Sequence, residues 1–278
     1  MILVTGASGG LGALVLERLA GTTDVLAGSR TPHQVATGGE VRRLDFDDPT
    51  SLVAGFEGAE VVLLISAGQG EDDTVIARHG AAIDAAERVG VRHIVYTSLT
   101  GAGDCLALAL THRWTERRLM AGRADWTILR NGLYAELAIP GAAQAATTGR
   151  YDGPMGAGRW AAVARQDLAT VAAKVTADAA SHGGKVYELV GEETVSGADI
   201  ARTVADATGQ HVSYEPTDLT QLRAGLTHAG LPAWQVPTVV STFANIAAGF
   251  LAGTGGDLRV LLDAPPRCAL SVIAAALG

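Results

Sequence analysis

A glycine-rich turn close to the N-terminus constrains the fold of this chain more than any other feature. An apolar run ends just before Gly6, and Gly9 and Gly12 follow in the pattern G-x-x-G-x-x-G. Residues 13–19 then carry apolar side chains at helical spacing. In such a strand–turn–helix unit, one glycine allows the tight turn, one lets the backbone approach a pyrophosphate, and one lets the helix pack on the strand. The pattern predicts a dinucleotide-binding loop, with the phosphates at the helix N-terminus.

The order of apolar and amphipathic segments predicts the fold class. After the first strand, further strands are expected at residues 24–27, 41–45, 60–65, 91–97 and 126–130. Helices are expected between them at residues 49–55 (with Asp48 as N-cap), 73–89 and 106–122. Regular alternation of strands and helices is typical of an α/β protein with a Rossmann-like, doubly wound parallel sheet.

The regular alternation of apolar and amphipathic segments ends after residue 134. Residues 135–160 are rich in Ala, Gly and Thr and contain several breakers, which predicts an excursion over the carboxyl edge of the sheet. A helix at 166–180, a strand at 185–190 and a helix at 196–208 follow. We expect an NAD(P)-binding Rossmann domain over residues 1–134, with its sheet completed by residues 161–190. Residues 135–160 and 191–278 are then expected to form a smaller C-terminal α/β lobe that binds substrate.

Composition and charge exclude several classes of protein. Hydrophobic residues make up 48% of the chain and the net charge is −8, so a folded globular protein without a nucleic-acid-binding surface is expected. No apolar run reaches the roughly 18 residues of a membrane span. Met1 leads directly into a strand without a basic leader. We therefore expect a cytoplasmic protein with no membrane or nucleic-acid partner.

Neither the cysteines nor the histidines show metal-ligand spacing. Cys105 and Cys268 lie far apart, and the seven histidines form no H-x-x-x-H pattern, so we predict no metal. A disulfide between them is not expected in a cytosolic chain. Cys105 is expected to be a small buried or half-buried side chain, and a redox role for it stays open as an alternative.

The end of the second predicted strand indicates which nicotinamide cofactor is bound. Enzymes that use NAD usually carry Asp or Glu there, to bind the ribose hydroxyls. This chain has Arg30 instead. A guanidinium pairs with the extra 2′-phosphate of NADP(H), which favours NADP(H) as the cofactor. The alternative is that Arg30 is a solvated loop residue. Asp45 is placed to meet the adenine amino group, and its alternative is an acid at the start of the next helix.

The remaining cofactor contacts are expected from the glycine-rich loop and from the carboxyl ends of the strands, where ligands of such sheets bind. The predicted cofactor-binding residues are Thr5, Gly6, Ser8, Gly9, Gly10, Leu11, Gly12, Arg30, Asp45, Phe46, Ser66, Ala67, Thr97 and Ser98.

The usual catalytic pair of short-chain dehydrogenases is absent. These enzymes carry Ser after the fifth strand and Tyr-x-x-x-Lys on the next helix, where the Lys lowers the pKa of the Tyr that donates a proton. Ser98 is in the first place, but His112 and Glu116 occupy the Tyr and Lys positions. Glu116 is interpreted as a surface partner of Arg113 or Arg117 on the helix, not as an acid catalyst.

Several segments together resemble one family. They are the loop 5–12, Ser29-Arg-Thr-Pro32, residues 93–98, His112-x-x-Thr-Glu116, residues 127–134 followed by Glu136, and residues 184–189. Over residues 1 to about 220, the chain resembles the NmrA-like atypical short-chain dehydrogenases, and most closely their bacterial NAD(P)H:quinone oxidoreductases. The family often has Trp where this chain has Leu133, which puts the shape of the substrate pocket in doubt.

The resemblance implies hydride transfer from NADPH to a quinone-like small molecule, and a homodimer is compatible with it. A quinone accepts hydride readily, so the site must mainly orient it and stabilise developing oxyanion charge. His112, Asn131 and Tyr134 are the candidate catalytic residues. Their alternatives are helix packing for His112, support of the backbone for Asn131, and a pocket wall for Tyr134.

Two other functions stay open at this point. The missing Tyr/Lys pair also suits a non-catalytic NADP(H) sensor, and Leu133 with the weakly matching C-terminal lobe suits a tailoring reductase or epimerase of secondary metabolism.

Overall fold

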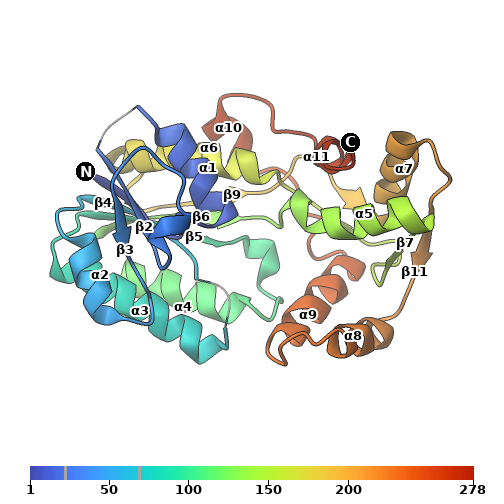
Figure 1. Ribbon diagram of the computed structural model, residues 1–278, viewed down its shortest axis with the longest axis horizontal. Coiled ribbons are helices and arrows are strands. Elements are labelled where there is room, and N and C mark those ends of the chain that lie inside the picture. Colours follow the sequence, from blue (N-terminus) through green and yellow to red (C-terminus); the bar gives the residue numbers. More distant parts are fainter. Residues whose placement is uncertain (22–23, 68–69) are drawn as a thin grey trace. The chain divides into compact units, whose positions relative to one another are not determined.

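A seven-stranded sheet has the order β3-β2-β1-β4-β5-β6-β9, with six strands from the N-terminal half of the chain and β9 from residues 185–189. The computed structural model describes residues 1–21, 24–67 and 70–278 (Figure 1). The strands are β1 (Ile2–Val4), β2 (Val25–Ser29), β3 (Val41–Arg43), β4 (Val61–Ile65), β5 (His93–Leu99), β6 (Asp125–Asn131) and β9 (Lys185–Leu189). Neighbouring strands from β3 to β6 pair in parallel. The predicted Rossmann-like α/β fold is confirmed.

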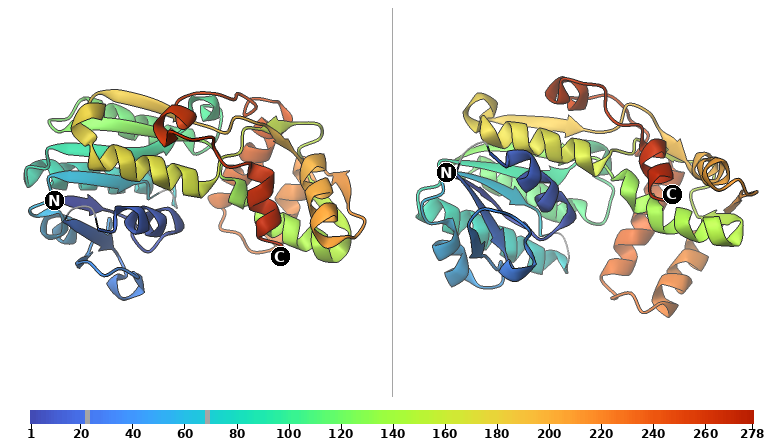
Figure 2. Two further views of the ribbon diagram at one scale, coloured as in Figure 1. Left: turned by 90° about the horizontal axis from the view of Figure 1, so that it is seen from above. Right: turned by 45° about the horizontal axis from the view of Figure 1, so that its top comes forward.

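Helices cover both faces of this sheet (Figures 1 and 2). One face carries α2 (Pro49–Phe56), α3 (Asp72–Arg88) and α4 (Ala109–Met120). The other carries α1 (Gly10–Leu19) and α6 (Arg165–Ala177). Short 3-10 helices lie at η1 (Pro32–Gln34), η2 (Gly101–Gly103) and η4 (Ala179–His182).

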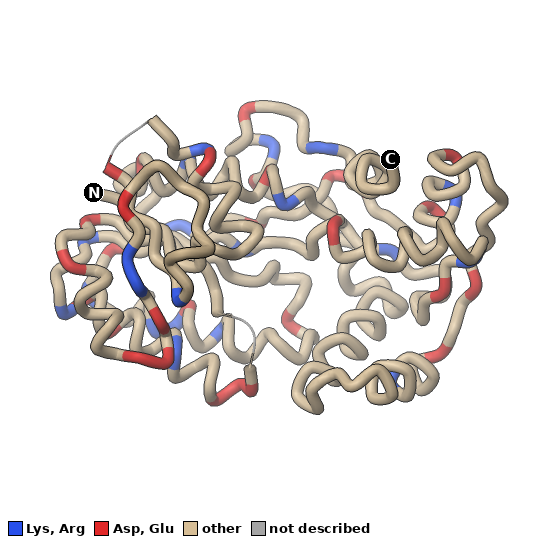
Figure 3. Tube along the Cα trace, viewed as in Figure 1, with Lys and Arg blue, Asp and Glu red and all other residues tan. Residues whose placement is uncertain are grey.

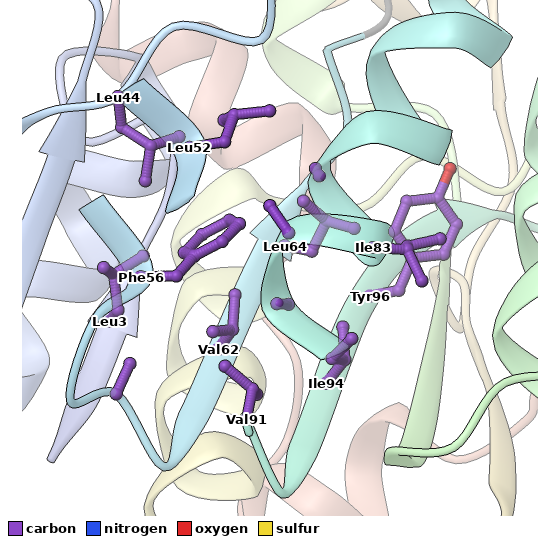
Figure 4. Packing of buried hydrophobic residues seen from close by; sticks show 14 of the residues in the cluster. Leu3, Leu44, Leu52, Phe56, Val62, Leu64, Ile83, Val91, Ile94 and Tyr96 are labelled. Atoms are coloured by element: carbon purple, nitrogen blue, oxygen red, sulfur yellow. The ribbon is translucent and has the colours of Figure 1, made fainter. Parts of the chain in front are cut away.

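One hydrophobic core cluster lies between the sheet and the helices α2 and α3 (Figure 4). Alternate residues of each strand point to this face, because successive side chains of a strand point to opposite sides. Phe56 is fully buried there, which is worth roughly 1.5–3 kcal/mol for a side chain of its size. The labelled members of the cluster are Leu3, Leu44, Leu52, Phe56, Val62, Leu64, Ile83, Val91, Ile94 and Tyr96.

The chain divides into two compact units. The first comprises residues 1–99, 110–131 and 168–187, and the second comprises residues 100–109, 132–167 and 188–278. In the second unit, β7 (Arg150–Gly153) pairs in parallel with β11 (Ser213–Pro216), and β8 (Arg159–Trp160) pairs antiparallel with β10 (Val195–Ser196). Its helices are η3 (Ala135–Ala138), α5 (Ile139–Thr148), α7 (Gly197–Thr208), α8 (Leu219–His228), α9 (Gln235–Ala247), α10 (Leu258–Leu262) and α11 (Ala269–Ala275).

Caps explain where several helices begin and end. The Asp48 carboxylate accepts the backbone N–H groups of Thr50 and Ser51, as predicted for the N-cap of α2. Ser196 caps α7 in a capping box, and Gly209 ends it in the left-handed conformation, at φ 69°.

The excursion predicted for residues 135–160 contains a helix that the sequence did not indicate, α5. Its proline and glycine were interpreted as breakers. Pro140 instead lies in the first turn, where its missing N–H costs nothing, and Gly149 is the left-handed C-cap at φ 70°. The predicted helix at 106–122 begins only at Ala109, because η2 and turns occupy the preceding residues.

Along the trace, Lys and Arg residues are scattered among Asp and Glu residues (Figure 3). Within the described part of the chain, no helix is long and apolar enough to span a lipid bilayer.

Candidate functional site

The glycine-rich loop joins β1 to α1, and each of its three glycines has a distinct structural reason. Gly6 has φ 61°, a backbone conformation that side chains other than glycine rarely adopt. A Cβ on Gly12 would collide with the carbonyl oxygen of Gly6, so the helix packs against the turn only with glycine there. Gly9 is the N-cap of α1, and its N–H donates to the Gly6 carbonyl at 2.9 Å.

A pocket of about 440 Å³ opens beside this loop, which is within the range of small-molecule and cofactor sites. It lies at the carboxyl ends of the strands, where the strand order reverses between β1 and β4, the place where doubly wound sheets bind ligands. All of its lining residues belong to the first unit: Gly6, Ser8, Gly9, Ser29, Arg30, Thr31, Gln34, Leu44, Asp45, Phe46, Asp47, Ile65, Ser66, Ala67 and Arg78.

This pocket brings together many of the residues that the sequence predicts for cofactor binding. Gly6, Ser8, Gly9, Arg30, Asp45, Phe46, Ser66 and Ala67 all line it. Most of the additional lining residues are direct neighbours of these in the sequence. Gln34 and Arg78 are the exceptions, and Arg78 lies within α3, so only the fold carries it to the pocket.

The other predicted cofactor residues lie behind the pocket wall or beside it. Thr5 and Thr97 are buried, and their hydroxyl oxygens accept the backbone N–H groups of Ile65 and Ser66. Ser98 is buried and donates to Glu116 at 2.6 Å. Gly10, Leu11 and Gly12 form the first turn of α1.

Two arginines give the pocket its positive charge, and they differ in their partners. Arg78 forms a two-pronged ion pair with Asp47, with both N···O distances 2.7 Å. Hydrogen bonding from Arg78 holds the pKa of Asp47 below its usual value. Arg30 is exposed and makes no ion pair with any residue that the structure describes. Arg30 acts on Asp47 only through its charge and is thus the one better placed to bind an added phosphate.

Ser29 directly precedes Arg30 in the sequence, and Ser8 lines the same pocket. Ser29 donates to the Ser8 hydroxyl at 3.0 Å and accepts the Thr31 N–H at 3.0 Å. The turn after β2 is therefore joined to the glycine-rich loop.

Asp45 lines the pocket, and its carboxylate accepts the N–H of Asp47 at 3.2 Å. The acid that begins α2 is Asp48, so the alternative placing Asp45 at the helix start is wrong.

His112 is buried against the sheet. Its Nδ1 lies 2.8 Å from the hydroxyl of Tyr96 on β5. Burial lowers the pKa of His112 to about 4, so its imidazole is neutral at pH 7.

Glu116 is not on the surface, which corrects the interpretation of this residue as an exposed helix partner. Its side chain is 4% exposed. Arg113 is a partner, as predicted, at 2.8 Å, but the second partner is Arg130 on β6, at 2.9 and 2.7 Å, instead of Arg117. Burial raises the pKa of the Glu116 carboxyl, but hydrogen bonds from Arg130 and Ser98 outweigh it, and the pKa lies below its usual value.

Asn131 ends β6, and its side chain is buried. Its Oδ1 has no hydrogen-bond partner among the described residues. Buried polar atoms are nearly always paired, so a lone acceptor at the carboxyl end of a strand indicates a ligand or water that completes it.

Tyr134 belongs to the second unit and is half-buried. The guanidinium of Arg165 lies 5.1 Å from its ring centroid, within the range of a cation–π contact. The N–H of Arg165 donates to the Glu136 carboxylate at 3.0 Å. Leu133, which precedes Tyr134, lines a small cavity with Val190, Trp160 and Leu251 of the same unit.

Both cysteines are exposed thiols, so the expectation that Cys105 is buried or half-buried is wrong. Cys105 lies in the turn that follows η2, and Cys268 is the N-cap residue of α11. Among residues 1–21, 24–67 and 70–278, no group of three His, Cys, Asp or Glu side chains is arranged to hold a metal ion.

Comparisons with known proteins agree with this geometry. Residues 6–179 match the profile of a family described as NAD(P)H-binding. Quinone oxidoreductase 2 of Escherichia coli (strain K12) is 33% identical over 273 residues, which cover 95% of this chain and 94% of that protein. An NmrA-like family domain-containing oxidoreductase of Aspergillus flavus is 26% identical over 301 residues, covering 96% and 93%. The crystal structure of an NADPH-dependent quinone oxidoreductase from Escherichia coli, complexed with NADPH, superposes with a TM-score of 0.91, at 32% identity and with 100% of each chain covered.

Proposed function

The chain belongs to the NAD(P)H-binding family, and from this premise we propose that it is an NADPH-dependent reductase that transfers hydride to a quinone or a related conjugated carbonyl. The observation that carries the proposal is the likeness to quinone oxidoreductase 2 of Escherichia coli over nearly the whole length of both chains. The guanidinium of Arg30, where NAD enzymes place an acid, supports NADPH over NADH.

The residues of the pocket fit a dinucleotide. Gly6 and Gly9 leave bare backbone in the pocket wall beside the N-terminus of α1, where N–H groups and the helix dipole favour a pyrophosphate. In the proposed assignment, Arg30 holds the 2′-phosphate, Asp45 and Phe46 contact the adenine, and Ser66 and Ala67 contact the ribose. When bound, NADPH supplies the hydride.

The chain's own residues then have to orient the acceptor and stabilise negative charge. A quinone that accepts a hydride becomes a hydroquinone anion, which takes its proton from solvent, so no side chain has to donate a proton in the same step. We propose that Asn131 and Tyr134 contact the acceptor, because amide and phenol groups can bind a developing oxyanion. His112, which contacts the Tyr96 hydroxyl and is neutral at pH 7, does not act as an obligatory acid in this proposal.

The proposal extends to the substrate-binding unit, the partners and the location of the protein. The second unit, with Tyr134, is proposed to contribute the substrate-binding residues. The proposed partners are a quinone-like small molecule and a second copy of the chain, and the proposed location is the cytoplasm.

The test is NADPH oxidation with a panel of quinones and enones, repeated with NADH. Turnover with a quinone, faster with NADPH than with NADH, would support the proposal. Tight binding of NADP(H) without turnover of any acceptor would favour the sensor function, and turnover of enones alone would favour a tailoring reductase.

Arg30→Ala is expected to weaken NADPH binding by roughly 1.5–3 kcal/mol, the scale of a hydrogen bond to a charged group. NADH binding should change little, because that cofactor has no 2′-phosphate for the guanidinium to bind. Isothermal titration of both cofactors measures the difference. An equal loss for both would remove Arg30 from the 2′-phosphate site.

His112→Phe is expected to lower kcat by less than about a hundredfold, which is the low end for loss of a general acid. The pKa of His112 lies near 4, so the wild-type kcat should also be independent of the His112 charge between about pH 6 and 8. Steady-state kinetics at saturating NADPH measure both. A loss of several thousandfold would instead make His112 the proton donor and point to a substrate other than a quinone.

A further inference from the structure

Three consecutive backbone N–H groups at the carboxyl end of β4 are each bound by a buried side chain from a different part of the first unit. These bonds run from Ile65 N to Thr5 Oγ1 at 2.9 Å, from Ser66 N to Thr97 Oγ1 at 3.1 Å, and from Ala67 N to His79 Nε2 at 3.0 Å. The segment 65–67 lines the pocket beside the glycine-rich loop. Its shape is therefore set by side chains as well as by strand pairing.

His79 differs from the two threonines because it lies on α3 and reaches the segment from the helical layer. It is fully buried. A backbone N–H can only donate, so Nε2 must carry the lone pair that accepts from Ala67. The neutral ring then carries its hydrogen on Nδ1, which donates to Thr115 Oγ1 at 2.8 Å.

The chain of hydrogen bonds continues from His79 to Thr115 on α4. Thr115 donates its hydroxyl hydrogen to the Thr111 carbonyl at 2.7 Å. The bonds from Ala67 to His79, from His79 to Thr115 and from Thr115 to Thr111 each have one possible donor, and the Ser66 hydroxyl lies 3.4 Å from the same Nε2 of His79. Burial lowers the pKa of His79 to about 3, so the neutral ring that this chain of bonds requires is the form present at pH 7.

We propose that His79 is a positioning residue for the cofactor: it holds Ser66 and Ala67 in the conformation in which they form the wall of the dinucleotide pocket. The inference rests on the proposed function, because it assumes that NADPH occupies this pocket. Without the His79 acceptor, the Ala67 N–H must bind water or rotate away. The backbone of residues 66–67, which forms the pocket wall, then shifts.

The test compares His79→Phe and His79→Gln with a matched control, His93→Phe. His93 is also a buried histidine of the first unit that contacts a threonine hydroxyl, with its Nε2 2.8 Å from Thr127 Oγ1. It begins β5, whereas the pocket lies at the carboxyl ends of the strands. Isothermal titration gives the Kd for NADPH, thermal denaturation gives the stability, and kinetics at saturating NADPH give kcat.

We expect His79→Phe to raise the Kd for NADPH about tenfold, the change that corresponds to 1.4 kcal/mol, while kcat at saturation stays within a few fold of wild type. His79→Gln should recover most of the affinity, since its amide oxygen can accept from Ala67. His93→Phe should lower the melting temperature but leave the Kd unchanged.

Two results would overturn the role of His79: a wild-type Kd in both His79 variants, or an equal rise in Kd for His93→Phe. Should His79→Phe fail to fold, an unchanged Kd in His79→Gln together with one in Thr115→Val would overturn it, whereas a raised Kd in both would support it. A wild-type protein that does not bind NADPH at all would instead overturn the proposed function.

Discussion

Gly9→Val is expected to abolish NADPH binding while the fold survives. Gly9 lines the pocket and is exposed, and a Cβ placed on it would already lie 3.2 Å from the Gly6 carbonyl oxygen. The two methyl groups of Val would extend from there into the space proposed for the pyrophosphate. We expect the Kd to rise by more than about a hundredfold, or 2.7 kcal/mol. Isothermal titration measures the loss, and circular dichroism checks the fold.

Gly38→Val is the matched control, because a Cβ on Gly38 would meet nothing within 4 Å and Gly38 lies outside the proposed cofactor pocket. It should leave NADPH affinity unchanged. Retained NADPH binding in Gly9→Val would mean that the phosphates bind elsewhere than at the glycine-rich loop.

The sequence predicts most of the proposed cofactor pocket because the relevant residues follow strands. A strand end can be recognised from an apolar run and the small residues after it, and parallel strands bring their carboxyl ends to one edge of the sheet. This reasoning predicts Arg30, Asp45 and Ser66, which line the pocket. The same reasoning explains why Arg78 and His79 were missed. Both lie within α3, where nothing local distinguishes a side chain that reaches the pocket wall from one that faces solvent or the core.

Partners that lie far apart in the sequence account for the main error at the site. Arg113 lies three residues before Glu116 and Arg117 directly follows it, so the local charges predict a solvated helix face. Arg130 lies on the next strand, and only the β5–β6 pairing brings it to the same carboxylate. Chain topology therefore decides whether such an acid is solvated or buried, and periodicity within one helix does not reveal it.

The buried position of Glu116 leads to the largest expected effect on stability. Its carboxylate, 4% exposed, lies between Arg113 and Arg130, which are 20% and 25% exposed. Glu116→Gln would leave two partly buried guanidinium groups facing a neutral amide. Removal of one partner from a buried ion pair typically costs 3–5 kcal/mol, and the partial exposure of the arginines places the expected loss at about 3 kcal/mol. Urea denaturation at pH 7 measures it.

Glu60→Gln is the control variant for an exposed ion pair. The pH dependence of stability is a second test of the ion pairs that Glu116 forms with Arg113 and Arg130. Glu60 pairs with Arg92 at the surface and is 53% exposed, so its replacement should lower the stability far less than the replacement of Glu116 does. Because the folded-state pKa of Glu116 is lowered, its contribution to stability is present above the unfolded-state pKa and is lost as the pH falls through the lower folded-state value. The gap between wild type and Glu116→Gln should therefore be full at pH 7 and shrink below about pH 4.5. A gap at pH 7 as small as that of Glu60→Gln would mean that water replaces the carboxylate around both arginines, and that the network does not hold α4 to β6.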